Sequence, residues 1–537
     1  DDRAAAERLR AWRRRLDEAA LADDRALGAA QEMCRDERRA DAAAAHHARI
    51  SKLAADLGKA LGATGTRPNG EVAEAPPSRP GLQSLDLERA DAALAELCRA
   101  LEQAEQEGLD FSFVLQLDCT KPVIDMCLGI KDSVSEISSA GGRDVPPKFR
   151  QLSNLLLSAL KWLGLLCKQR VPRAFLLLSG RVAALADVAT ACLDAHLGSA
   201  AGGQLPEASS PTVLFLPQAL HVLALSAGEA SSCGAGAVQP LLAPYLAACG
   251  LPRKIWELFR LAELRGTRSF EGPSPVPLLL LRSMTYLETV VSLLRPPAEQ
   301  EDADGCSAHV LKELRCTELF GLPSVLMSFL LSAGARDKAM RLPQTVVSLA
   351  VQAVRILNQI ARFDLSTLQD ALGAHSRPEL YHLLVFIFEY CNARLHGVRA
   401  AQPPHPDERE LLHETLTLLG FYCLQRPNNQ GIMCFGAGQT LLALITSLPL
   451  HYFMDEPGRC VLFPTILAAC FRSERNLELL QNEMNLCLLE DFLSSALAEP
   501  AAEARPLGPG ARALAERFPR ALWQEAATFF CDSCAAF

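Results

Sequence analysis

The chain has 537 residues, 49% of them apolar and 21% charged, which excludes a disordered polymer and supplies material for a sizeable hydrophobic core. A formal net charge of −9 excludes a protein whose whole surface wraps nucleic acid, although it leaves room for a local basic patch. Only 6% of the residues are aromatic, while Leu and Ala are abundant. Because these two residues lose little rotamer freedom in a helical turn, the composition favours an all-α fold.

Residues 1–61 form a charged segment with 13 basic and 12 acidic residues, many alanines and no proline. This composition predicts one long, exposed, charged helix. Its apolar seam is thin, since only Ile50, Leu53, Leu57 and Ala60 or Leu61 keep a heptad-like spacing. We therefore expect a helix that docks at its end rather than a coiled coil. Residues 62–84, rich in Gly and Pro, are predicted to be a flexible linker.

Residues 85–498 consist of apolar, helix-like segments separated by short Gly- and Pro-containing breakers such as "SAGGRDVPPK" and "AAQPPHPDE". Helices that follow one another without strands predict a bundle or a solenoid, and internal repetition favours the solenoid. Residues 499–511 are expected to form a loop, and residues 512–537 a C-terminal helix.

Three segments align without gaps and carry the repeat argument. They begin at Cys167, Cys423 and Cys470, and each cysteine is followed by a turn, a short amphipathic segment and a breaker 13 residues on. The breakers are Gly180, Gly436 and Glu483, and a leucine recurs five residues after each one. Cys423 and Cys470 are 47 residues apart, close to the period of armadillo and HEAT repeats. One such unit cannot bury its apolar face alone, so an armadillo-like solenoid is predicted.

The stretch "GAG" at residues 436–438 invites comparison with a phosphate-binding loop. Such a loop needs a preceding strand and a following Lys-Ser or Lys-Thr pair, and neither is present. We interpret Gly180, Gly436 and Gly438 as structural hinges, whose freedom to adopt positive φ lets the chain turn between helices. Gly438→Val should then unseat residues 441–448.

No catalytic, cofactor-binding or metal-binding constellation is predicted, and we expect a non-enzymatic protein without a cofactor. "CDSC" at Cys531 and Cys534 lacks a second ligand pair, and "HETL" at His413 lacks the second histidine of a helical metalloprotease site. The sets Cys306, His309, Cys316 and Cys34, His46, His47 also lack a fourth ligand. The 18 cysteines lie mostly inside apolar runs, which is typical of a reducing compartment.

One window of the chain is strongly basic. Between Val145 and Arg181 there is no acidic residue. The seven cations of this basic window are Lys148, Arg150, Lys161, Lys168, Arg170, Arg173 and Arg181. They could contact ribosomal RNA or an acidic protein surface through phosphate or carboxylate groups. The alternative is a solvated helix face whose charge is balanced by acids of adjacent repeats.

Armadillo arrays that hold extended peptides present a ladder of asparagines on their inner helices. The equivalent positions here are Leu165, Phe421 and Ala468. This substitution predicts binding of folded domains instead of extended peptides.

Three segments near the end of the chain are similar to a known family. They are residues 411–455, residues 461–493 and "ERFPRALWQEAATFF" at residues 516–530. Together they resemble the C-terminal region of the S-phase cyclin A-associated proteins of the endoplasmic reticulum. Weaker likeness extends back through residues 317–331 and 145–157 to "ISKLAADLGKAL" at residue 50.

The resemblance implies a scaffold or adaptor with protein partners. In the implied pathway a ribosome-bound tetratricopeptide factor senses nascent tubulin, and the adaptor recruits a deadenylase complex so that tubulin messages decay. The resemblance also implies binding to cyclin A and its kinase. The cyclin docking signal is an Arg-x-Leu motif, which "RAL" at residues 25–27, 512–514 and 520–522 matches only trivially. The first function is therefore favoured.

The expected location is the cytoplasm, with association to the endoplasmic reticulum implied by the resemblance. Apolar runs such as "VPLLLLRSMTYLETVVSLL" are interrupted by charge, so no membrane-spanning segment is predicted. No signal peptide opens the chain, which begins at Asp1, and we expect it to be a fragment of a longer protein.

Overall fold

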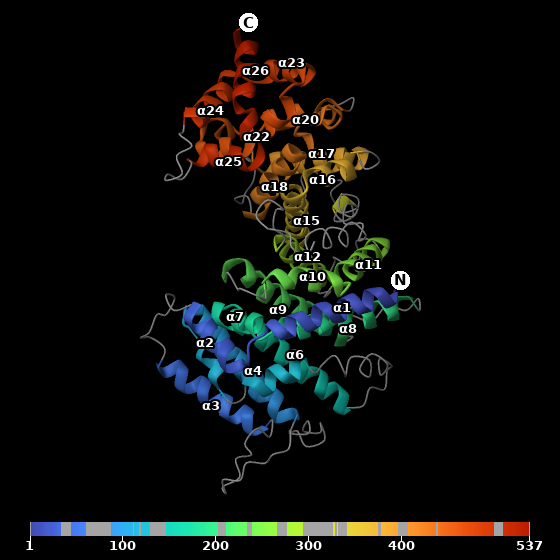
Figure 1. Ribbon diagram of the computed structural model, residues 1–537, viewed down its shortest axis with the longest axis vertical. Helices are drawn as coiled ribbons and strands as arrows, with labels where there is room; N and C mark the ends of the chain where they lie inside the picture. Colours follow the sequence, from blue (N-terminus) through green and yellow to red (C-terminus); the bar gives the residue numbers. More distant parts are fainter. Residues whose placement is uncertain are drawn as a thin grey trace. The chain divides into compact units, whose positions relative to one another are not determined.

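The computed structural model describes most of the chain. The described residues are 2–33, 44–60, 87–110, 112–117, 120–128, 147–201, 211–233, 239–265, 276–293, 326–327, 330, 341–373, 377–395, 406–435, 439–498 and 508–535. Within these residues every regular element is a helix, which confirms the predicted all-α class (Figure 1). The chain divides into two compact units, residues 1–258 with 272–317 and residues 259–271 with 318–537.

The first unit is built from helices of very different length. In chain order they are α1 (Asp2–Ala19), α2 (Asp23–Met33), α3 (Ala44–Ala60), α4 (Leu87–Gln106), η3 (Ser112–Gln116), α6 (Pro147–Leu166), α7 (Arg170–Leu178), α8 (Arg181–Ala201), α9 (Pro211–Cys233), α10 (Gln239–Ala248) and α12 (Val276–Ser292). Helices α3, α4, α6, α9 and α12 pack in that order, each against the next. The residue boundary between the units falls within α11 (Leu251–Arg265).

Helix α6 buries its apolar side inside the first unit and exposes Lys161. Leu156, Trp162, Leu163 and Leu166 are among its buried side chains. Helix α6 packs on α4 on one side and on α9 on the other. The apolar side of an amphipathic helix is buried in this way, while its polar side stays in water.

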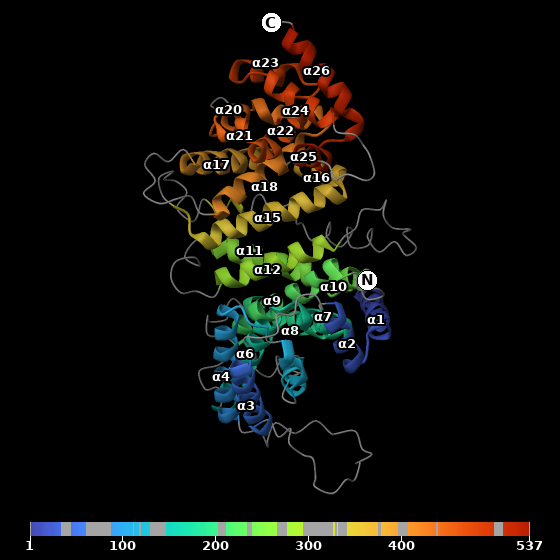
Figure 2. The same cartoon turned by 90° about the vertical axis from the view of Figure 1, so that its left-hand side faces the viewer.

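The second unit combines long and short helices. It contains α15 (Gln344–Phe363), α16 (Leu365–Gly373), α17 (Arg377–Leu395), α18 (Pro406–Cys423), α19 (Pro427–Gln430), η7 (Gly431–Cys434), α20 (Leu441–Thr446), α21 (His451–Met454), α22 (Glu456–Cys470), α23 (Glu474–Glu483), α24 (Cys487–Ala498), α25 (Pro509–Arg517), η8 (Arg520–Leu522) and α26 (Trp523–Ala535). Helix α18 packs between α15 and α22, as Figure 2 shows.

The three aligned segments of the sequence occupy equivalent places. Cys167 directly follows α6, and Cys423 and Cys470 are the last residues of α18 and α22. A short second helix and then a third helix follow each of them. This succession is compatible with the predicted armadillo-like repeat array.

Side-chain amides connect successive long helices in the second unit. Nε2 of Gln369, on α16, donates to the carbonyls of Phe421 and Leu424 at the end of α18, at 2.8 Å each. Nε2 of Gln430 does the same for Ala468 and Phe471 at the end of α22, at 3.0 and 2.9 Å. The last carbonyls of a helix have no partner within it, so each glutamine satisfies two groups that stacking has taken out of water.

Asparagines provide a second cap at the same helix ends. Nδ2 of Asn429 donates to the Tyr422 carbonyl at 3.0 Å, and Nδ2 of Asn476 to the Ala469 carbonyl at 2.8 Å. Both asparagines lie six residues after the cysteine of their segment, and both acceptors lie one residue before it. The turns after Cys423 and after Cys470 are therefore closed by equivalent asparagine-to-carbonyl hydrogen bonds.

Arg517 on α25 connects α18 and α22. Its Nη1 donates to the Val461 carbonyl at 2.7 Å, and its Nη2 contacts Thr465 Oγ1 and, at 3.4 Å, the Leu416 carbonyl. A Cβ on Gly420 would lie 3.2 Å from Arg517 Nη2, so the glycine makes room for the guanidinium. Burial lowers the pKa of Arg517 to about 10, since a charge inside the protein loses its hydration.

The N-terminal segment differs from the expected single helix. The structure has three helices there, separated at residues 20–22 and by residues 34–43, which lie outside the described residues. Helices α1, α2 and α3 pack on α10, α7 and α4, respectively. The chain turns because each piece has its own buried stripe, such as Ala26 and Ala30 on α2, and these stripes face different partners. The predicted linker over residues 62–84 lies outside the described residues.

The C-terminal segment also differs from the expected helix over residues 512–537. Helix α25 already begins at Pro509 and ends at Arg517, and η8 and α26 follow after a break. Phe518 is extended, with φ −142° and ψ 125°. The next residue is Pro519, whose ring disfavours a helical conformation in the residue before it, and this explains the break. Residues 499–507 of the predicted loop lie outside the described part of the chain.

Gly180→Ala is expected to loosen the N-terminal helices. Gly180 has φ +70°, and a Cβ there would lie 2.9 Å from the Cβ of Ala20. Left-handed backbone costs a residue with a Cβ about 1–2 kcal/mol, and the clash adds to that penalty. The variant should lower the thermal midpoint and speed amide hydrogen exchange in α1 and α2.

Gly198→Ala is the matched control, because Gly198 lies within α8 and has nothing within 4 Å of its added Cβ. This change should be neutral or stabilising, since Gly is the poorer helix former by roughly 0.5–1 kcal/mol. Equal effects of the two substitutions would contradict the packing role of Gly180.

Candidate interaction surfaces

The basic window lies on three consecutive helices of the first unit. Lys148, Arg150 and Lys161 are on α6, Lys168 is in the turn after it, Arg170 and Arg173 are on α7, and Arg181 begins α8. Lys161 and Lys168 are exposed, whereas Arg170, Arg173 and Arg181 are half-buried. The structure thus brings the later members of the window together around the α6–α7–α8 turns.

Several of these cations have partners inside the unit. Lys168 Nζ lies 2.6 Å from Glu105 Oε2, and Arg181 Nη2 lies 3.5 Å from Asp125 Oδ1. Arg173 Nη1 donates to the carbonyl of Lys168 at 3.1 Å. Arg181 also lies over the Phe175 ring, 5.4 Å from its centroid. These contacts match the alternative in which acids of adjacent helices balance the window, and a partner-binding role for it is a proposal.

A second basic surface, on α1, was not singled out by the sequence argument. Five arginines and no acidic residue occur between Arg8 and Arg15. The near balance of 13 basic and 12 acidic residues over residues 1–61 concealed this local excess. Counting charges along one helix instead of over the whole segment would have found it.

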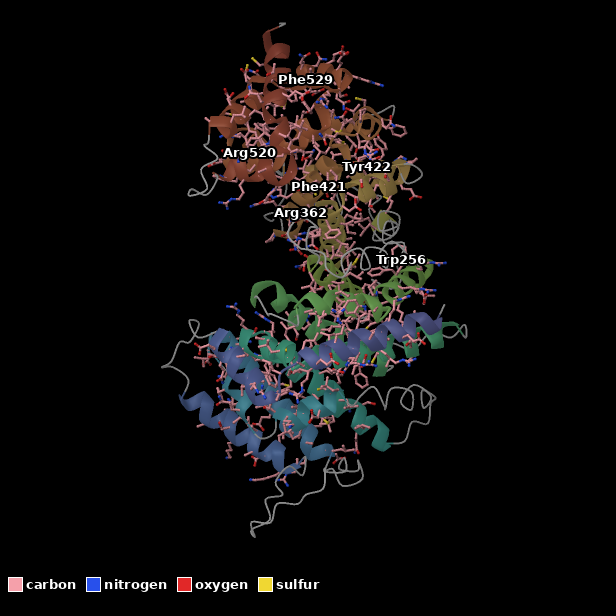
Figure 3. The ribbon with its side chains drawn as sticks, viewed as in Figure 1. Trp256, Arg362, Phe421, Tyr422, Arg520 and Phe529 are labelled. Carbon is pink, nitrogen blue, oxygen red and sulfur yellow. The ribbon has the colours of Figure 1, made fainter. Side chains whose placement is uncertain are left out.

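The positions of the armadillo asparagine ladder hold buried residues. Leu165, Phe421 and Ala468 are 9%, 4% and 1% exposed, and Figure 3 shows Phe421 next to Tyr422 on α18. The amides that are buried instead, such as Gln369 and Gln430, bond to helix carbonyls. These two glutamines, on α16 and α19, connect their helices to the ends of α18 and α22. Gly436 and Gly438 lie outside the described residues, and the hinge role assigned to them and to Gly180 stays a prediction.

Many cysteines serve as small buried hydrophobes. Burial raises the pKa of the Cys98, Cys167 and Cys192 thiols to about 12. A thiol with so high a pKa is neutral at physiological pH and is a poor nucleophile and metal ligand. Among the described residues, no group of three or more His, Cys, Asp or Glu side chains is placed to hold a metal ion.

The predicted Cys and His sets are only partly described. Cys34, Cys306, His309 and Cys316 lie outside the described residues, and His46 and His47 are on α3. Cys531 is exposed on α26, which also contains Cys534.

His413 is a half-buried, hydrogen-bonded histidine. Its Nε2 lies 2.8 Å from the hydroxyl of Tyr452 on α21. Burial, followed by the charge of Arg409, lowers the pKa of His413 to about 4. The ring is therefore neutral in the folded protein at pH 7 and holds α21 against α18.

No single helix within the described ranges is both long and apolar enough to cross a bilayer. The pair Arg170–Leu178 and Arg181–Gly198 is together long and apolar enough, but the two helices are bent by 88° at the break between them.

The described residues define the class of protein as all-α, with helices packed against one another in each unit. No family model matches the chain. The chain is similar to the human S phase cyclin A-associated protein in the endoplasmic reticulum, with 28% identity over 246 residues. The similar region covers 43% of this chain and 16% of the human protein. The chain thus matches only a small part of that relative.

Charge reversal of Lys168, Arg170 and Arg173 together tests the basic window. If the window contacts an acidic partner, the triple Glu variant should lose partner binding and the salt dependence of that binding. Because Arg173 also donates to helix-end carbonyls, the folding of the variant is checked by its thermal midpoint. Unchanged binding and an unchanged salt dependence would assign the window to internal charge balance.

Acid should destabilise the second unit through His413. The folded-state pKa of His413 is about 4, below the ordinary value of 6.5, so the unfolded chain binds the extra proton between these values. Stability is therefore complete above pH 6.5 and falls as the pH approaches 4, by roughly 1 kcal/mol at pH 5 after allowing for solvent screening.

His413→Gln keeps a hydrogen-bonding group near Tyr452 and removes the titration. Urea unfolding between pH 7 and pH 4.5 should show a flatter pH dependence in this variant. His382→Gln, at an exposed position of α17, is the control and should leave the wild-type slope intact. If the wild type and both variants showed the same dependence of stability on pH, His413 would not be the group whose protonation destabilises the second unit.

Proposed function

We propose that this chain is a non-enzymatic adaptor whose stacked helices present surfaces to folded protein partners. The observation that carries the proposal is the similarity of 246 residues to part of the human cyclin A-associated protein, in a chain whose described residues form stacked helices. Helical arrays of this kind commonly act through extended binding surfaces. The use of buried amides as helix caps supports binding of folded domains over binding of extended peptides.

In the first proposed role, the adaptor links translation to mRNA decay. It bridges a ribosome-bound tetratricopeptide factor that senses nascent tubulin to a deadenylase complex, so that tubulin messages are degraded during translation. The sequence words at residues 411–455 and 461–493 support this role through the family resemblance. The proposed location is the cytoplasm, in association with the endoplasmic reticulum, as the name of the human relative suggests.

The second candidate is a cell-cycle adaptor that binds cyclin A and its kinase. The printed name of the human relative favours it. Against it, Leu514 of the "RAL" at residues 512–514 is fully buried, so this motif is not available for docking in the folded chain. The same holds in part for the motif at residues 25–27, in which Ala26 is buried.

Affinity purification separates the two roles. The chain is isolated from translating cells in which tubulin synthesis is induced or repressed, and the bound proteins are identified by mass spectrometry. The first role predicts ribosomal proteins, the tetratricopeptide factor and deadenylase subunits, with recovery that follows tubulin synthesis. Recovery of cyclin A and its kinase without those proteins would favour the second role.

A further inference from the structure

Helices α9 and α12 lie side by side in the first unit, in both Figure 1 and Figure 2. His221 on α9 contacts Arg282 on α12, and a Cβ added to Gly228 would lie 3.8 Å from the side chain of Thr289. These two pairs have the same separation in the sequence, so α9 and α12 run in the same direction.

The side of each helix that is not buried meets the other at the His221–Arg282 contact. Successive residues of an α-helix are roughly 100° apart, so residues four apart share a side. Leu225 therefore lies on the side of α9 that carries His221, and Leu278 on the side of α12 that carries Arg282. None of the four is buried, and Leu278 is 39% exposed. The contact thus joins the two sides into one accessible face.

Arg282 carries a charge that no acid balances. Its Nη1 donates to His221 Nδ1 at 2.7 Å. Within the part of the chain that the structure describes, this is the only hydrogen bond of the guanidinium, and no carboxylate pairs with it. Burial lowers the pKa of Arg282, since the charge loses hydration without gaining a counter-charge. Nε and Nη2 therefore stay available to an anion.

His221 holds the guanidinium without neutralising it. Because Nδ1 accepts from Arg282, the neutral ring carries its proton on Nε2. Burial, followed by the charges of Arg282 on α12 and Lys168 after α6, lowers the pKa of His221 to about 4. The imidazole is therefore neutral at pH 7, and its Nε2–H is a second donor beside the charged one.

The neighbouring groups favour a carboxylate of a protein over RNA. Lys168, the next cation along this face, already pairs with Glu105 at 2.6 Å. Single-stranded RNA is bound by a track of cations interleaved with aromatic rings, whereas leucines flank the Arg282–His221 pair. One guanidinium with a free edge matches one carboxylate, which it binds in a bidentate manner.

We propose that the Arg282–His221 pair binds the carboxylate of an Asp or Glu side chain on the surface of a partner protein. Leu278 packs against an apolar side chain beside that acid. This contact rests on the proposed adaptor function, because it gives the adaptor one of its protein-binding surfaces.

The test is an NMR titration of the full chain with 13C-labelled histidine rings. The probe is the peptide acetyl-Gly-Leu-Glu-Leu-Gly-amide, which places one carboxylate between two apolar side chains. It should shift the His221 signal, identified by its loss in His221→Gln, in a saturable manner. The same peptide with Gln in place of Glu should bind at least about tenfold more weakly, since the charged hydrogen bonds are lost.

Two substitutions of Arg282 separate binding from folding. Arg282→Gln should weaken the Glu peptide at least about tenfold without lowering the thermal midpoint, because the removed charge has no counter-charge. Arg282→Lys keeps the charge but not the bidentate geometry, and should weaken it about threefold. Lys52→Gln, at an exposed position of α3, removes the same charge elsewhere and should change affinity less than about twofold.

Equal affinity of the Glu and Gln peptides, or of wild type and Arg282→Gln, would overturn the proposal. A lower thermal midpoint of Arg282→Gln with no peptide binding by the wild type would show that Arg282 only ties α12 to α9. Tighter binding of an oligouridine RNA than of the peptide through Arg282 would assign the face to RNA.

The affinity purification described above keeps this contact distinct from the adaptor function. If the wild type and Arg282→Gln recovered the same partners equally, the adaptor would stand and the contact would be rejected. If the wild type recovered no partners, the adaptor would be rejected, whereas the peptide titration would still decide whether the pair binds a carboxylate.

Discussion

The packing of helices in the second unit depends on hydrogen bonds to the carbonyl groups at the helix ends. The last carbonyls of a helix have no partner within the helix, and packing another repeat against them removes water as a substitute. Gln369 and Gln430 solve this for α18 and α22, and Asn392 on α17 does so for α20, with its Nδ2 3.0 Å from the Leu444 carbonyl. Each bond is worth only about 1 kcal/mol net, but an unsatisfied buried carbonyl would cost more than that. These hydrogen bonds therefore favour the observed pairing of each amide-bearing helix with the helix whose carbonyls it caps.

Arg517 also donates to backbone carbonyls, but these carbonyls lie within helices instead of at their ends. From α25 it forms hydrogen bonds to α18 and α22, and it is separated from Leu416 by 101 residues in the sequence. A buried guanidinium is costly unless its donors are used, and here burial has already lowered its pKa. Gly420 and Thr465 supply the space and an acceptor that an aliphatic core would not need. The contact thus specifies the position of α25 more than it adds stability.

Local signals in the sequence were sufficient for the all-α class and for the order of helices around Cys167, Cys423 and Cys470. A cysteine, a turn and a short helix recur at fixed offsets, and such patterns are set by neighbours along the chain. The break between α1 and α2 could not be predicted in this way. It depends on Leu178, which accepts from Leu21, and on Gly180, which leaves room for Ala20. Both are tertiary contacts over more than 150 residues, and alanine-rich sequence alone favours an unbroken helix.

Charge counts along the sequence were also insufficient to predict which surfaces of the protein are basic. A count along the sequence selected the window from Lys148 to Arg181, but Lys168 and Arg181 have acidic partners on other elements. On α1 the charge is uneven along the helix, because its five arginines between Arg8 and Arg15 are interrupted by no acid, while Glu7, Asp17 and Glu18 flank them. By pairing with Asp187, Arg13 fixes which side of α1 faces the unit, and the turn of the helix then directs Arg10 and Arg14 to solvent. The half-buried Arg13–Asp187 ion pair thus decides which arginines of α1 are exposed.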